Sequence, residues 1–268
     1  MNTHQHFYRF LLLPGLCIAS VICRAQGFES NLTKYWGYNT ALIMPAHKWE
    51  SGIAQPFRYG INEKLELRSN ELEIPFLPNA GLKVALGKKE GNFIATEHLV
   101  GYPTVFLNTV GMKGTGGLIS PEFAPFPAIV SLQNNVLVSR AAGSRGLMTI
   151  NLGYTFAIRS SKPDPNATID LPLVYPRMAH YYDGSTIRLG FSYKGMISKK
   201  FLFEDGVESF FILRKENNFF FENTGAVMWI VGGSFRIRGG YSLSYGKYPY
   251  GTQWQLWPSL DVIFGSKL

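Results

Sequence analysis

Apolar and polar residues alternate with a period of two through most of this chain. In the segment 147–158 every even-numbered residue from Met148 to Ile158 is apolar, and the residues between them are small or polar. The segments 186–193, 235–245 and 254–264 alternate in much the same way. Because successive side chains of a β-strand point to opposite faces, this pattern predicts antiparallel strands with one apolar and one polar face.

The alternation predicts an all-β fold of about 12 strands, within a range of roughly 10 to 14. We expect them near residues 49–58, 63–70, 80–88, 92–100, 127–139, 146–159, 173–182, 185–197, 200–214, 219–231, 234–246 and 254–266. Long connections are expected at 101–126 and 160–172, with short turns elsewhere. No linker divides the chain, so a single domain is expected.

The first residues have the features of a secretory signal peptide. Arg9 precedes the short apolar run 10–22, and Ala25-Gln26 offers a cleavage site after small residues. We therefore expect residues 1–25 to be removed and residues 26–268 to form the folded domain. Both cysteines, Cys17 and Cys23, would leave with the signal. The formal charge would fall from +8 to +6 with the loss of Arg9 and Arg24, and no basic block of nucleic-acid type remains.

The apolar face of such strands can face either a protein core or lipid. A soluble sandwich would show the same alternation. An exported, cysteine-free chain with long alternating segments and aromatic residues near their ends is more typical of a barrel in the bacterial outer membrane. Only a closed barrel satisfies every backbone group of a β-structure in hydrocarbon. The sequence therefore predicts one antiparallel transmembrane barrel.

The segment WESGIAQPFRYGINEKLEL, from Trp49 to Leu67, resembles the opening hairpin of small exported barrels of Gram-negative bacteria. It is similar to the family named after the meta-pathway of phenol degradation and to related barrels of Bacteroidota. The resemblance implies a barrel and the passage of small molecules, and no catalytic residue carries over from it.

Several charged residues lie on the polar face, which would line the lumen. They are Arg188, Lys194, Arg236 and Arg238, joined across the barrel closure by Glu66, Arg68 and Asp261. One interpretation is a cationic constriction that favours anionic solutes. The other is a lumen plugged by ion-paired side chains, with a purely structural role. For Arg236 and Arg238, the nearest acid expected from the sequence is Asp261, which cannot balance both.

Residues that could carry chemistry are few. The segment GMKGTGG, 111–117, lacks the ending and the strand–helix context of a phosphate-binding loop. A catalytic pair of His180 and Asp183 is conceivable, but a turn is the simpler interpretation, and the three histidines of the mature chain form no metal motif. No cofactor is expected.

The function expected from these features is a passive channel or small-molecule transporter with a cationic lumen. The alternatives are a structural or surface-interaction barrel and, more distantly, a barrel enzyme acting on lipid or peptide. The expected partners are outer-membrane lipid and lipopolysaccharide, the barrel-assembly machinery and a small anionic solute, but no nucleic acid.

Overall fold

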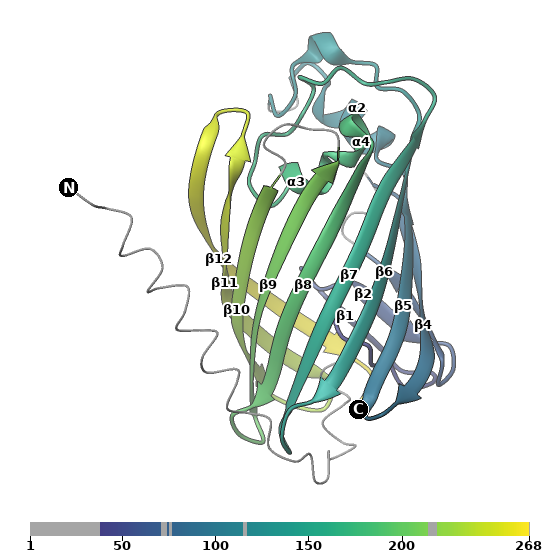
Figure 1. The fold of residues 1–268 in the computed structure, drawn as a ribbon, viewed down its shortest axis with the longest axis vertical. Coiled ribbons are helices and arrows are strands. Elements are labelled where there is room, and N and C mark those ends of the chain that lie inside the picture. The colour runs from purple at the N-terminus through teal and green to yellow at the C-terminus, as the bar shows by residue number, and fades with distance from the viewer. Residues whose placement is uncertain (1–37, 71–73, 75–76, 115–116, 214–218, 268) are drawn as a thin grey trace, which may run out of the picture.

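Twelve antiparallel strands close into one barrel (Figure 1). The structure is a computed structural model that describes residues 38–70, 74, 77–114, 117–213 and 219–267. The proposed signal peptide, residues 1–25, lies outside the described residues. The strands are β1 (Trp49–Gly52), β2 (Phe57–Gly60), β3 (Leu65–Ser69), β4 (Asn79–Lys89), β5 (Asn92–Gly101), β6 (Ile129–Ala141), β7 (Gly146–Arg159), β8 (Ser185–Met196), β9 (Phe201–Leu213), β10 (Phe219–Ile230), β11 (Phe235–Tyr248) and β12 (Gly251–Gly265).

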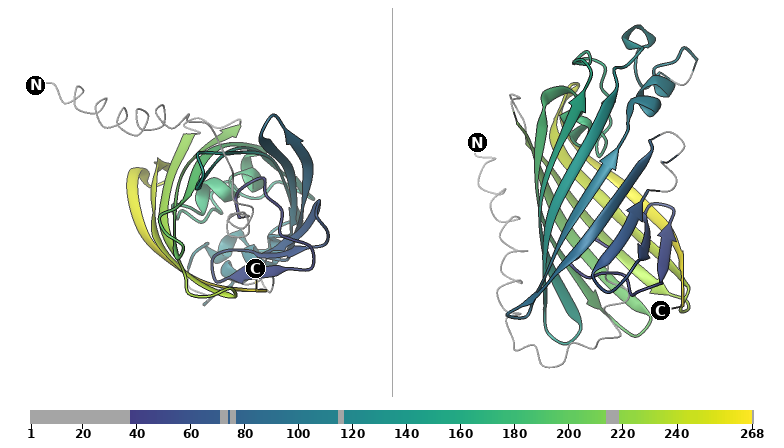
Figure 2. Two further views of the ribbon diagram at one scale, coloured as in Figure 1. Left: turned by 90° about the horizontal axis from the view of Figure 1, so that it is seen from below. Right: turned by 90° about the vertical axis from the view of Figure 1, so that its right-hand side faces the viewer.

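The barrel closes between its first and last strands, where Glu50, Ser51 and Gly52 of β1 face Gly265, Phe264 and Ile263 of β12. The strands differ greatly in length: β1 and β2 have 4 residues each, whereas β12 has 15. From Gly251 to Val262, β12 therefore pairs with no described strand on its β1 side. The wall is low over β1–β3 and high elsewhere, as the right-hand view of Figure 2 shows.

The period-two pattern describes the wall well. Ile150 of β7 and Leu189 of β8 are 58% and 46% exposed on the outer face. Thr149 and Thr186, which belong to the opposite parity, are buried inside. A polar group breaks the outer pattern, since Asn223 donates to Asp205 Oδ1 at 3.0 Å on the side of the barrel that carries Phe203 and Val227.

The expected number of strands is confirmed, but two of the expected strands are wrong. The segment 49–58 is two short strands, β1 and β2, because Gly52 N donates to Gln55 O and the Asp261 carboxylate accepts from Ala54 N and Gln55 N. The segment 173–182 is helical, with α3 at Tyr175–Met178 and α4 at His180–Asp183. Pro176 at the start of α3 fits a first helical turn, where its missing N–H costs nothing.

Both long connections lie at one end of the barrel, opposite the C-terminus (Figure 1). The segment 102–128 carries α2 (Thr104–Val110) and the 3₁₀ turn Pro121–Phe123, and the segment 160–184 carries α3 and α4. We call these two segments the cap. They share an apolar core that includes Leu107, Ile119, Phe126, Ile169 and Tyr182. Seen along the barrel axis, the helices lie within the ring of strands (Figure 2, left).

No helix among the described residues is long and apolar enough to cross a membrane.

Candidate functional site: the lumen

The segment 38–46, which we call the plug, crosses the lumen. Its backbone is held from four strands: Tyr38 O accepts from Lys194 Nζ at 2.7 Å, Leu42 O from Lys83 Nζ at 2.6 Å, Ala41 N donates to Ser139 Oγ at 2.7 Å and Met44 N to Glu66 Oε2 at 2.8 Å. The Leu42 side chain packs against inward residues of four further strands, namely Leu147, Leu202, Met228 and Ile263. The plug therefore fills the lumen near the end that holds the C-terminus.

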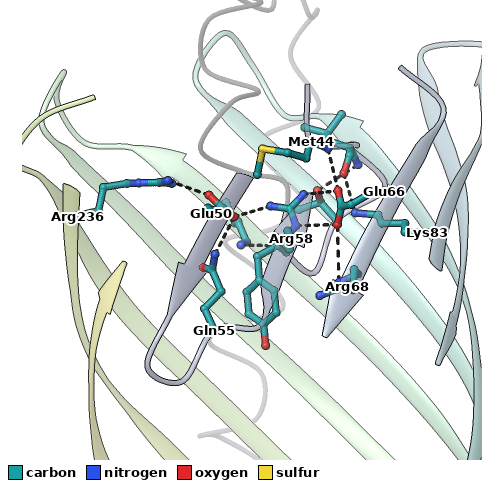
Figure 3. A network of polar contacts seen from close by, with 12 residues as sticks. Met44, Glu50, Gln55, Arg58, Glu66, Arg68, Lys83 and Arg236 are labelled. Carbon is teal, nitrogen blue, oxygen red and sulfur yellow. Dashed lines mark hydrogen bonds and ion pairs between the residues drawn. The ribbon is translucent and has the colours of Figure 1, made fainter. Parts of the chain in front are cut away.

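Arg58 is the centre of a buried ionic network beside the plug (Figure 3). Its guanidinium donates to Glu50 Oε1 at 2.5 Å and to the two carboxylate oxygens of Glu66 at 2.7 and 2.6 Å. Glu50 also accepts from Arg236 at 2.8 Å. Arg68 pairs with Glu97 and lies 3.7 Å from Glu66. The network thus joins five strands by ion pairs alone, so it ties the short strands β2 and β3 to the rest of the barrel.

A second set of ion pairs lies on the other side of the lumen. Lys194 and Arg238 share Glu204, at 3.1 and 2.8 Å. Arg188 lies 3.7 Å from Glu208 and donates to Asn135 Oδ1 at 3.0 Å. These contacts link β6, β8, β9 and β11 across the interior.

Charge inside the barrel is nearly balanced. Among the described residues, the inward cations that pair with acids or bind the plug are Arg58, Arg68, Lys83, Arg177, Arg188, Lys194, Arg236 and Arg238, and the acids are Glu50, Glu66, Glu97, Glu204, Glu208, Glu222 and Asp261. These eight positive and seven negative groups differ by one charge, and Arg159 of β7, which donates to the Tyr181 and Tyr182 carbonyls of the cap, adds one further cation. Asp261, the nearest acid expected from the sequence for Arg236 and Arg238, lies opposite Arg238 but caps the β1–β2 turn. The ion-pair partners of the two arginines are Glu50 and Glu204.

The partner acids could have been found from the sequence. Glu204 and Glu208 lie an even number of positions along β9 from the buried Leu202, so their side chains point to the same inner face. The same holds for Glu222 and the buried Phe220 of β10. Applying the alternation to acids as well as to bases would have placed them inside. Arg177 could not have been found this way, because the segment 173–182 was expected to be a strand.

Arg177 of α3 points into the barrel and separates two cavities. It donates to the two carboxylate oxygens of Glu222 at 2.5 and 2.7 Å and lies over the ring of Phe210 at 4.9 Å. The lower cavity, of about 250 Å³, lies toward the plug and has a polar lining that includes Asn39 and Asp261. The upper cavity, of about 500 Å³, lies under the cap. Arg177 lines both.

His180 is a buried residue of the cap, with its Nε2 atom 2.7 Å from Ser131 Oγ of β6. Burial lowers the pKa of His180 to about 3, so the imidazole is neutral at pH 7. The side chain of Asp183 lies outside the described part of the structure, so the pairing of His180 with Asp183 stays a prediction.

Residues 115–116 of the glycine-rich segment 111–117 also lie outside the described residues. Among the described residues, no cluster of His, Cys, Asp or Glu could hold a metal ion.

No protein-family model matches the chain, and a search of curated proteins gives no match. Among solved structures, it is similar to the outer membrane channel DcaP of Acinetobacter baumannii, at 8% identity, with a TM-score of 0.39 and coverage of 79% of this chain and 61% of that one. It is also similar to the Pseudomonas putida toluene transporter TodX, at 8% identity, a TM-score of 0.39 and coverage of 90% and 75%.

A bacterial polysaccharide outer membrane secretin is similar at 9% identity, with a TM-score of 0.45 and coverage of 80% and 69%. The chain spans less than two thirds of DcaP. At these identities the likeness concerns the barrel architecture, and the specific resemblance to the phenol meta-pathway family is not confirmed.

Proposed function

We propose that this chain is an outer-membrane barrel that passes small molecules through its lumen, without catalysing a reaction. The observation that supports this proposal best is the pair of cavities inside a closed barrel, both of which are lined by Arg177 of α3. The plug closes the path below them, so the structure corresponds to a closed state of the transporter.

The outer surface supports insertion in a membrane. Large apolar side chains face outward on successive strands; Leu256 and Leu260 of β12 are 67% and 69% exposed. Outer-membrane barrels have short periplasmic turns and longer extracellular loops. The C-terminal end carries short connections such as 197–200 and 231–234, so we assign it to the periplasm and the cap to the exterior. Outer-membrane lipid, lipopolysaccharide and the barrel-assembly machinery are the partners that this placement implies.

The charged groups of the lumen support a weaker selectivity for anions than the sequence suggested. A cationic constriction requires cations without nearby acids, whereas the arginines near the plug are ion-paired with glutamates.

Permeation of small solutes into proteoliposomes tests the proposal. Arg177→Ala removes the partition between the cavities, so it should raise permeation several-fold once the plug has opened. Lys199→Ala, in the exposed turn 197–200, is the matched control and should leave permeation unchanged. Migration that changes on boiling in detergent would show that each variant is a folded barrel.

A structural barrel is the second candidate function, favoured by the dense ionic network around Arg58. A barrel filled by the plug and its ion pairs would conduct nothing. Folded wild type and folded Arg177→Ala that both exclude small solutes would support this alternative and contradict transport.

A further inference from the structure

The upper cavity has two chemically different sides. Inward side chains of β6, β7 and β8 make a polar wall of Ser131, Gln133, Thr155, Thr186 and Arg188. The cap makes an apolar side from Phe106, Leu173, Val174, Pro176 and Met178. Ligand sites in proteins have this composition, a largely apolar lining with a few placed polar groups, in volumes of about 300–1,000 Å³. At about 500 Å³ the cavity is of that size.

Thr186 has an unused hydroxyl in this wall. The residue is only 4% exposed, and its Oγ1 atom has no hydrogen-bond partner among the described residues. A buried hydroxyl without a hydrogen-bond partner destabilises the folded protein. A ligand in the cavity would give the Thr186 hydroxyl the partner that none of the described residues provides.

Arg188 lies next to Thr186 on the same face of β8, two residues further along the strand. Its nearest carboxylate, Glu208, is 3.7 Å away, longer than a charge-assisted hydrogen bond. Gly153 lies opposite Arg188 on β7, and a Cβ atom there would lie 2.6 Å from Asn135 Oδ1 and 3.2 Å from Arg188 Nε. The glycine therefore leaves room for Arg188 to reach Asn135, which holds the guanidinium in place.

The charges around the cavity favour an anion. Arg177 and Arg188 line it, whereas no aspartate or glutamate does among the described residues. Arg177 is already bound to Glu222, so Arg188 is the cation with bonding capacity left.

We propose that the upper cavity binds a small amphipathic carboxylic acid. Its carboxylate accepts hydrogen bonds from Arg188 and Thr186, and its apolar body packs against the cap side chains Leu173, Val174 and Met178. This inference rests on the proposed transport function and names the class of molecule that the barrel selects.

Binding of 4-phenylbutyrate to the protein in lipid nanodiscs, measured by calorimetry against empty nanodiscs, tests the inference. The neutral analogue 4-phenylbutanol has the same apolar body without the charge. Wild type should bind the acid about tenfold more tightly than the alcohol, since charge-assisted hydrogen bonds are the stronger ones. Arg188→Gln should abolish this difference, whereas Arg188→Lys should retain part of it. Thr186→Val should weaken binding of the acid by about three- to tenfold.

The matched controls lie on the outer face: Arg140→Gln on β6 and Thr96→Val on β5 should bind as wild type does. Equal affinity of wild type for the acid and the alcohol, absence of binding, or an unchanged preference in folded Arg188→Gln would each overturn the inference. Transport is measured separately, as uptake of a small neutral solute. Binding without uptake would contradict the transport function alone, and uptake without binding would contradict the ligand site alone.

Discussion

At the residue scale, Arg58 shows how a buried charge is tolerated inside this barrel. It is fully buried, and its contacts with Glu50 and Glu66 use both ends of the guanidinium. Removing charge from water costs several kcal/mol, which only good geometry and further hydrogen bonds offset. Met44 N and Gln55 Nε2 supply such bonds to the two glutamates.

Arg58→Met should therefore destabilise the protein strongly. It leaves Glu50 and Glu66 buried with fewer partners, and breaking a buried pair in this way costs about 3–5 kcal/mol. Urea unfolding of the barrel in lipid vesicles measures the change. Lys64→Met, in the exposed β2–β3 turn, is the control. A shift no larger than that of the control would mean that the network does not stabilise the fold.

The outer face gives a second prediction at this scale. Ile150→Arg and Leu189→Arg place a charge against lipid, which costs about 2–4 kcal/mol at the bilayer midplane. Asn151→Arg and Ser192→Arg, at adjoining or nearby positions of the opposite parity, point toward the lower cavity and should be tolerated better. The yield of heat-modifiable barrel from each strain gives the comparison. Equal damage from both pairs would contradict the assignment of the two faces.

At the scale of elements, the sequence predicts long regular strands and fails at irregular ones. The strands β7, β8 and β11 are recognisable because one face touches lipid or solvent and the other the lumen, so the alternation is complete. The segment 173–182 is mostly apolar, with Arg177 and His180 as exceptions, because α3 and α4 contact both the lumen wall and the rest of the cap. Apolar runs of this length do not distinguish a strand from a buried helix.

The break between β1 and β2 was unpredictable for a different reason. The carboxylate that caps the turn belongs to Asp261, more than 200 residues away in the chain. The plug likewise depends on partners in distant strands, such as Ser139 and Lys194. Local sequence patterns carry no information about such contacts. The sequence therefore predicts which residues face the lumen, but it predicts the contact partners of those residues only in part.

The plug gives a prediction at the same scale. Leu42→Ala removes the side chain that packs among Leu147, Leu202, Met228 and Ile263, a loss of about 2–5 kcal/mol for a buried leucine. The plug should then leave the lumen more often, and planar-bilayer recordings should show more frequent openings. Leu256→Ala, on the outer face, is the matched control. Identical opening frequencies in the two variants would mean that the plug does not gate the lumen.

At the scale of the whole molecule, two systems close the lumen from opposite ends. The cap enters from the side of the long connections, and the plug with its ionic network fills the end that holds the C-terminus. The cavities that remain lie between them. In this arrangement many of the inward arginines are ion-paired with glutamates between the two closures.

The unequal height of the wall has a consequence for the surrounding membrane. On the β1 side of β12, the backbone groups between Gly251 and Val262 have no described strand to pair with, and hydrocarbon cannot satisfy such groups. In the placement proposed above, lipid beside β1–β3 must therefore keep its headgroups and water close to that exposed edge. Bilayers thin locally to match a short apolar surface, at a cost of fractions of a kcal/mol per Å. We therefore expect the bilayer to be thinned unevenly around the barrel, slightly beside β7 and strongly beside β1. The fold would thus determine the local thickness of the surrounding membrane.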